Sequence, residues 1–181
     1  MPNEPTKAAL RRLYTEKAAA LPPDYKREAS AAIAEKLSAH PAYLSAKTVF
    51  IYIGTPREPD TAAIIRSALA AGKRVFVPRC GKKPQMDAVE ITAQTVFYPN
   101  RFGIFEPQAG YCAAPEEIEL TVVPCVAADK NGVRLGHGGG YYDVFLQTCR
   151  CPAVCLCFSS LLADGLPAEV HDVPVTAVIT E

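Results

Sequence analysis

The sequence lacks an excess of charge of either sign. Its 19 Lys and Arg residues are matched by 19 Asp and Glu residues, so the formal net charge at pH 7 is zero. A balanced chain has no overall field that would attract nucleic acid or an anionic membrane surface. We therefore expect no nucleic-acid partner and no membrane partner, and any site for an anion must be local.

Long apolar runs are absent as well. No stretch approaches the roughly 20 apolar residues that a membrane-spanning helix needs, and the early cations Lys7, Arg11 and Arg12 are not followed by the apolar segment of a signal peptide. The sequence also shows no internal repeat and no low-complexity linker. We therefore expect a single domain over residues 1–181 that acts as a monomer in the cytoplasm.

The seven cysteines are an odd number in a chain that is large enough to fold without disulfides, which indicates a reducing compartment. Four of them lie close together, at Cys149, Cys151, Cys155 and Cys157. A metal site is one interpretation, because alternate residues of a strand share a face. The other, which the missing C-x-x-C spacing favours, is a buried parallel strand at residues 153–158 in which cysteine acts as a small hydrophobe.

Strands and helices alternate along the chain. Apolar strands are predicted at residues 48–53 and 74–78, and Asp60 or Thr61 can cap a helix between them that Gly72 ends. This βαβ unit predicts a mostly parallel sheet flanked by helices, with ligands outside the carboxyl ends of the strands. Glu58, Arg79 and a glycine-rich loop would lie at that edge.

The rest of the chain fits the same α/β pattern. Further strands are predicted at residues 86–92, 120–126, 153–158 and 173–180, and residues 96–108 are expected to form a long aromatic loop. Two helices are predicted near the N-terminus, capped by Asn3 and Asp24, and Pro41 is a stop signal for the second.

Residues 134–143, reading RLGHGGGYYD, hold four of the eleven glycines within five residues. An apolar strand and an Asn131–Gly132 turn precede them, and a helical pattern with Tyr141 above Phe145 follows. A glycine-rich turn between a strand and a helix exposes backbone N–H groups that bind phosphate oxygens together with the helix dipole. A merely flexible turn is the alternative.

Two further features concern charged residues. Lys7 and Arg11 share one face of the first helix, where they repel each other, so either an anion lies opposite them or that face is solvated. His171 and Asp172 are adjacent, but no Ser or Cys in a nucleophile motif accompanies them, which is typical of a local hydrogen-bonded pair.

Several separated motifs follow one another along the chain. Lys7, Leu10 and Arg11 form K-x-x-L-R, Glu58 and Thr61 form E-x-x-T, and residues 102–107 read FGIFEP. Residues 134–143 contain R-L-G-x-G-x-G-Y-Y-D, and a His–Asp pair precedes the ending ITE. In this order the motifs resemble those of the 5-formyltetrahydrofolate cyclo-ligase family over nearly the whole chain.

The resemblance implies a three-layer α/β fold similar to the NagB/RpiA/CoA-transferase-like fold. It implies conversion of 5-formyltetrahydrofolate to 5,10-methenyltetrahydrofolate with ATP and Mg²⁺, in which the γ-phosphate is transferred to the formyl oxygen, N10 closes the ring and phosphate departs. Such chemistry needs positioning and charge neutralisation more than a covalent nucleophile. The alternatives are a non-catalytic folate-binding module and a relative of the sugar-phosphate isomerases or CoA-transferases.

The resemblance also implies roles for individual residues. Arg134 would be catalytic, Glu58 and Tyr141 would bind the folate, and Asp143 and Asp172 would bind Mg²⁺. The residues expected to bind ATP are Lys7, Arg11, Arg134, Leu135, Gly136, His137, Gly138, Gly139, Gly140, Tyr141 and Tyr142. His137 and Gly139 occupy variable positions of the motif, so we expect no catalytic role for His137.

The chain departs from the family pattern at four positions and has no Trp. Cys125 stands in place of Gly, Ala128 in place of Phe, Val144 in place of a basic residue and Thr176 in place of Asp. We expect these changes to alter the detail of the pocket and its affinity, and not the reaction.

Overall fold

A seven-stranded sheet forms the centre of the computed structural model, which describes residues 5–100 and 103–181. The strand order is β12-β10-β7-β1-β2-β3-β6. The strands of this sheet are β1 (Thr48–Ile51), β2 (Arg74–Cys80), β3 (Met86–Ile91), β6 (Cys112–Ala113), β7 (Leu120–Val123), β10 (Ala153–Leu156) and β12 (Ala177–Ile179). Strands β12 to β2 are parallel, and β3 and β6 add antiparallel pairs at one edge. The predicted mostly parallel α/β sheet is confirmed.

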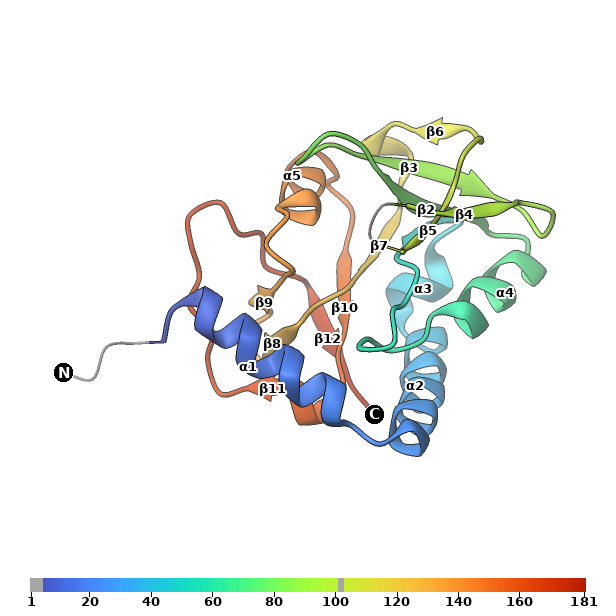
Figure 1. Cartoon of the computed structure of the whole chain (residues 1–181). Coiled ribbons are helices and arrows are strands. Elements are labelled where there is room, and N and C mark those ends of the chain that lie inside the picture. The colour runs from blue at the N-terminus through green and yellow to red at the C-terminus, as the bar shows by residue number, and fades with distance from the viewer. Residues whose placement is uncertain (1–4, 101–102) are drawn as a thin grey trace.

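Helices cover both faces of this sheet (Figure 1). On one side lie α2 (Pro23–Ser38), α3 (Pro41–Ser45) and α4 (Ala62–Ala70), and on the other lies α5 (Tyr141–Thr148). Helix α1 (Lys7–Ala20) runs along the side of the molecule that carries α5, next to the short 3₁₀ turn η2 (Ser159–Leu161). A second 3₁₀ turn, η1 (Pro115–Glu117), precedes β7.

The alternation of side chains along β1 explains how the sheet packs against helices on both of its faces. Val49 and Ile51 share one apolar cluster with residues of α2 and α4, whereas Phe50 points to the opposite face. There Phe50 packs against Phe145 of α5, with ring centroids 4.6 Å apart. Helix α5 is therefore anchored to the sheet next to the glycine-rich loop from which it starts.

Two smaller sheets complete the fold. The first joins β11 (Leu162–Ala163), β8 (Ala127–Asp129) and β9 (Arg134–Leu135). Its β8–β9 turn contains the predicted Asn131–Gly132 pair, with Gly132 in the left-handed region at φ +82°, and buried Asp129 accepts hydrogen bonds from the N–H groups of Asn131 and Val133. This turn places Arg134 at the start of the glycine-rich loop.

The second small sheet corrects an expectation. Residues 96–108 are not simply a long loop, because β4 (Phe97–Pro99) pairs with β5 (Phe105–Pro107) as an antiparallel hairpin. Glu106 of this hairpin accepts a hydrogen bond from the backbone N–H of Cys80 at 3.0 Å, which holds the hairpin against β2. The motif residue Phe102 lies outside the described residues.

The predicted starts of the first two helices were wrong. Helix α1 begins at Lys7 with Thr6 as its N-cap, and Asn3 lies outside the described residues. Helix α2 begins at Pro23, so Asp24 lies within its first turn. Its end before Pro41 is confirmed, since the helix stops at Ser38, and Pro41 then starts α3. In each proline case the ring occupies the first turn, where the missing N–H costs no hydrogen bond.

The cysteines follow the structural interpretation. Cys155 and Cys157 are buried in or beside β10, which has parallel partners on both sides. Cys149 and Cys151 form a separate pair near Thr121, with their Sγ atoms 2.7 Å apart. Among the described residues no group of three cysteines lies close enough to share a metal ion.

None of the helices in the described part of the chain is both long enough and apolar enough to cross a bilayer.

Candidate active site

The glycine-rich loop, residues 136–140, connects β9 to α5 and depends on its glycines. Gly138 and Gly140 have φ of +86° and +73°, a region that side chains disfavour. A Cβ on Gly139 would lie 2.5 Å from the ring of Tyr141. Gly140 is the N-cap of α5 and supplies no side chain to its first N–H groups, which leaves them to bind an anion.

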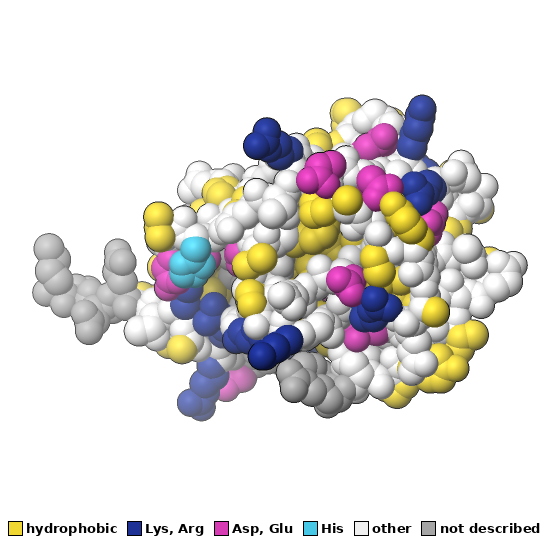
Figure 2. All heavy atoms as spheres, turned by 90° about the horizontal axis from the view of Figure 1, so that it is seen from above, with side chains coloured by type: hydrophobic (Ala, Val, Ile, Leu, Met, Phe, Trp, Pro, Cys, Tyr) yellow, Lys and Arg dark blue, Asp and Glu magenta, His cyan; other side chains and the backbone are white. Residues whose placement is uncertain are grey.

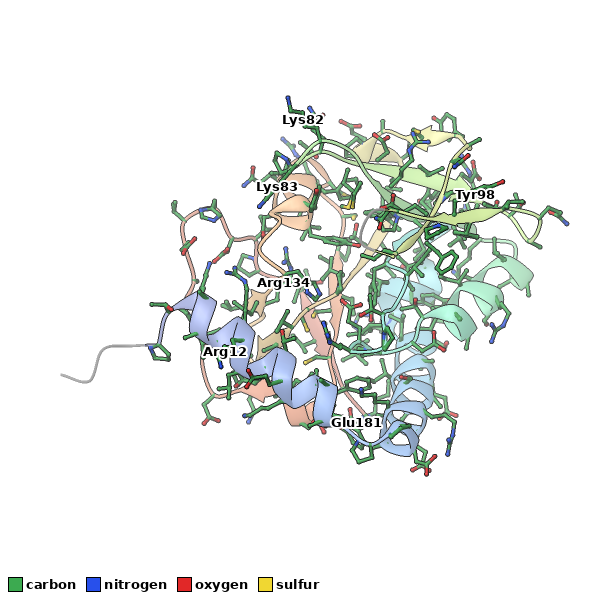
Figure 3. All side chains as sticks on the ribbon, in the orientation of Figure 1. Arg12, Lys82, Lys83, Tyr98, Arg134 and Glu181 are labelled. Atoms are coloured by element: carbon green, nitrogen blue, oxygen red, sulfur yellow. The ribbon has the colours of Figure 1, made fainter. Side chains whose placement is uncertain are left out.

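Two cations reach this loop from distant parts of the chain. The Arg11 Nε donates to the carbonyl oxygen of Gly136 at 2.8 Å, and the Lys83 Nζ donates to that of Gly138 at 3.0 Å. Lys83 belongs to the connection between β2 and β3, and Figure 3 shows it beside α5, with Arg134 next to the glycine-rich loop. Both cations therefore lie against the backbone of the glycine-rich loop.

Arg134 is the most enclosed cation of the site. Its side chain is 4% exposed, and its Nη2 donates to Asp143 Oδ1 at 2.7 Å. The same carboxylate oxygen accepts a hydrogen bond from the backbone N–H of Val173 at 3.1 Å. Within residues 5–100 and 103–181, the Arg134 Nε is the one buried side-chain nitrogen or oxygen without a hydrogen-bond partner. Such a donor is stabilised when an anion enters the site.

Lys7 lies one helical turn before Arg11 and faces acidic residues of the C-terminal segment. Its Nζ is 2.5 Å from Asp172 Oδ2 and 3.4 Å from Glu169 Oε2. Burial by itself raises the pKa of Asp172, but the hydrogen bond from Lys7 and that from the Glu169 N–H hold it below its ordinary value. Glu169 and Asp172 of the chain itself thus supply negative charge opposite Lys7.

Glu169, His171 and Asp172 also form a group of possible metal ligands. One ligand atom from each lies within 4.8 Å of the others, and no other such group of three or more occurs among the described residues. Carboxylate oxygens suit Mg²⁺, which keeps several waters and takes one or two carboxylates from the protein. Asp143 is not a member of the group, because Arg134 holds it. The donors at Glu169 and Asp172 fit Mg²⁺, whereas the imidazole of His171 is a poorer ligand for it.

Glu58 follows β1 and is almost fully enclosed, with 5% of its side chain exposed. Its Oε2 accepts the backbone N–H of Thr55 at 2.9 Å, and its Oε1 lies 2.9 Å from His137 Nε2. Burial by itself raises the pKa of Glu58, but the hydrogen bond and charge of His137, with the contacts to Thr55, hold it below its ordinary value. The structure thus joins Glu58 to the glycine-rich loop.

The two tyrosines at the start of α5 point in different directions. Tyr142 stacks on Phe50, with ring centroids 6.1 Å apart, and burial followed by the charge of Glu58 raises its pKa well above the ordinary value. Tyr141 instead lines a pocket of about 230 Å³ beside α5, together with Met86 and Val144. Figure 2, seen from above, shows apolar side chains in a hollow near the centre of the molecule, with acidic and basic side chains around them.

The structure brings most of the predicted site residues together. Arg11 and Arg134 meet the glycine-rich loop, Asp143 pairs with Arg134, and Lys7 pairs with Asp172. Leu135 is buried in the core, so it offers only its backbone to a ligand. Arg79, expected at the same edge, turns to Asp87 and the Gln108 carbonyl instead.

Two contributors were missed from sequence. Lys83 and Glu169 carry no spacing signal, because each reaches the site through a loop whose path depends on the whole fold. His137 was expected among the ATP-binding residues, without a catalytic role, and its contact with Glu58 was not foreseen.

Comparison with known proteins places these observations in a family. The sequence model of the 5-formyltetrahydrofolate cyclo-ligase family matches residues 3–181. The 5-formyltetrahydrofolate cyclo-ligase of Escherichia coli (strain K12) is 30% identical over 168 residues, which cover 89% of this chain and 92% of that protein. The protein of the same name from Mus musculus is 27% identical over 189 residues, which cover 97% of this chain and 93% of that protein.

A solved structure agrees with the fold. The NMR structure of Aquifex aeolicus 5,10-methenyltetrahydrofolate synthetase matches this chain with a TM-score of 0.85 at 27% sequence identity. The match covers 96% of this chain and 88% of the Aquifex chain.

Proposed function

The chain belongs to the 5-formyltetrahydrofolate cyclo-ligase family, and from this we propose that it converts 5-formyltetrahydrofolate and ATP to 5,10-methenyltetrahydrofolate, ADP and phosphate. The observation that carries the proposal is a single connected site. The glycine-rich loop contacts Arg11 and Lys83 at its carbonyls, and His137 links the same loop to the enclosed carboxylate of Glu58. A phosphate-binding loop and a folate-binding carboxylate therefore lie in contact.

The reaction needs an activated oxygen. The formyl oxygen is a poor leaving group until the γ-phosphoryl group of ATP is transferred to it, with ADP leaving. N10 of the folate then attacks the formyl carbon and loses its proton, the ring closes, and the carbon–oxygen bond breaks to release phosphate, which takes up that proton. Phosphoryl transfer depends on positioning and on neutralising charge. This requirement suits a site rich in cations and backbone N–H groups.

Arg134 is the residue best suited to stabilise charge on the transferred group. It is fixed by Asp143, and its buried Nε–H has no partner among the described residues. A preorganised donor of this kind needs no rearrangement as charge develops. Arg11, Lys83 and the N–H groups of the loop would hold the remaining phosphate oxygens, with Lys7 and the Tyr142 end of α5 completing the nucleotide site.

Glu169 and Asp172 would hold Mg²⁺, whereas Asp143 is paired with Arg134 and the N–H of Val173. Bound Mg²⁺ would neutralise charge on the phosphates of ATP. Lys7 donates a hydrogen bond to Asp172 in the structure. We therefore expect the Lys7 side chain to leave that carboxylate and pair with a phosphate oxygen when the nucleotide binds.

Glu58 would accept hydrogen bonds from the pterin N–H groups, and Tyr141 would contact the folate from the pocket beside α5. The alternative function, a non-catalytic folate-binding module, does not explain why the buried cation Arg134 is present. A sugar-phosphate isomerase or CoA-transferase activity gives no role to Lys7, Arg11 or Glu58. We also propose that the protein works as a monomer in the cytoplasm, where seven free cysteines are stable.

Mixing the protein with ATP, Mg²⁺ and 5-formyltetrahydrofolate tests the activity through the near-UV absorbance of the methenyl product. Product formation by the folded protein is expected, and its absence would leave only the binding-module reading. Glu58→Gln should raise the KM for the folate by about tenfold, the effect of one lost charge-assisted hydrogen bond. The exposed Glu28→Gln serves as the matched control and should leave both constants unchanged.

A further inference from the structure

His137 is the one side chain that crosses from the glycine-rich loop to the carboxylate assigned to the folate. The His137 side chain is 57% exposed, whereas that of Glu58 is 5% exposed, so His137 lies between solvent and the buried carboxylate. The two residues are 79 positions apart in the chain, and their contact measures 2.9 Å. A carboxylate can only accept hydrogen bonds, so the imidazole donates through Nε2–H.

The hydrogen bonds of Glu58 leave part of its capacity free. A carboxylate offers about four lone-pair positions. The backbone N–H of Thr55 uses one on Oε2, His137 uses one on Oε1, and the Thr55 side chain also hydrogen-bonds to the carboxylate. The capacity that remains suits a ligand that carries N–H donors.

No other cation balances the charge of Glu58 among the groups described around it. The ionisable groups that face it are His137 from the loop, Tyr52 after β1 and Tyr142 from α5. Burial, and then the charge of Glu58 itself, raises the pKa of both tyrosines, so they stay neutral. Burial is the largest influence on the pKa of Glu58 and favours its protonated form, and the hydrogen bond and charge of His137 are the largest influences that oppose it.

We propose that His137 is a positioning residue, whose hydrogen bond keeps Glu58 ionised so that the carboxylate can accept hydrogen bonds from the N–H groups of the pterin. The proposal rests on the assignment of Glu58 to the folate. It gives a task to a motif position that the family pattern leaves variable, and it means that the phosphate loop helps to shape the folate site.

The test is direct binding of 5-formyltetrahydrofolate without ATP, measured by calorimetry between pH 4 and pH 8. A protonated Glu58 cannot accept the hydrogen bonds of the pterin N–H groups as a carboxylate does, so binding is lost as the pH falls through its pKa. Because His137 holds the pKa of Glu58 below its ordinary value, His137→Ala should raise that pKa, and the acid limb of the binding curve should move to higher pH. On that limb the variant should bind more weakly than the wild type, whereas at pH 8 the two should agree.

Two further variants separate positioning from a general loss of structure. His137→Gln keeps a neutral donor at the same place, so its acid limb should lie between those of the wild type and His137→Ala. His40→Ala removes an imidazole that caps α3, and its binding curve should follow the wild type. A His137→Ala curve that superimposes on the wild type overturns the proposal, as does a loss of equal size at every pH.

These outcomes differ from a failure of the proposed function. If Glu58→Gln weakens folate binding at every pH while His137→Ala changes nothing, Glu58 keeps its role and only the inference about His137 is wrong. If the wild-type protein binds no folate at all, the function itself is wrong.

Discussion

Replacing Arg134 with Ala should reduce turnover far more than it weakens folate binding. The side chain is enclosed between Asp143 and the glycine-rich loop, and its Nε–H has no partner within the described chain. In the proposed mechanism, removing it eliminates the donor for the transferred phosphoryl group, whereas the contacts of Glu58 remain. The folate site should therefore stay nearly intact.

Two magnitudes follow from the geometry. Removing one partner of a buried ion pair costs about 3–5 kcal/mol of stability, and the lower end applies because Asp143 is 19% exposed and keeps the Val173 N–H. A domain of ordinary stability, about 5–15 kcal/mol, remains folded after such a loss. Losing one preorganised donor to a developing oxyanion lowers kcat by about 10² to 10³. Arg134→Lys keeps the charge but loses the planar fork, so it should fall between Arg134→Ala and the wild type.

Urea unfolding measures the stability of the variant. Steady-state kinetics are then measured without urea, at a temperature where the variant is fully folded. Formation of the methenyl product gives kcat and the KM for each substrate. Arg66→Ala removes an exposed arginine of α4 and serves as the matched control. A variant with normal kcat and a folate KM raised more than tenfold would refute the reasoning, because it would place Arg134 in the folate site.

The remaining predictions concern the first helix and one turn. Arg11→Ala should raise the KM for ATP by about tenfold, the effect of losing a charge-assisted contact. Arg12→Ala on the same helix removes only an exposed ion pair with Glu16 and should have no effect. Equal effects of the two substitutions would argue against the assignment of Arg11. Gly132→Ala should lower the free energy of unfolding by about 3 kcal/mol or more, because it adds a backbone clash to a positive φ, and its new Cβ would lie 2.4 Å from a carbonyl oxygen. Gly72→Ala also has a positive φ but meets open space, so urea unfolding should show only about 1–2 kcal/mol, and equal losses would contradict the clash.

Local patterns predicted the central strands well. Strands β1, β2 and β10 are short apolar runs between turn residues, and a buried parallel strand needs little more than that. Helix starts were less predictable, because Pro23 and Pro41 can either end one helix or begin the next. The β4–β5 hairpin was missed because its pairing is stabilised by contacts to β2 that the local sequence does not encode.

The sequence by itself determined the glycine-rich loop and its flanks. The order of strand, glycines and helix depends on the φ values that only glycine adopts easily and on neighbours a few residues away, so the motif could be recognised without a structure. It also determined which cations and carboxylates were available, because a motif states residue types and spacing.

Only the tertiary structure decided which of these groups meet. Lys83 reaches Gly138 across 55 positions, His137 reaches Glu58 across 79, and Lys7 reaches Asp172 across 165. Contacts over such separations are set by the path of the sheet and its connections, and no local preference encodes them. The fold therefore brought the glycine-rich loop, through its residue His137, into contact with the carboxylate of Glu58.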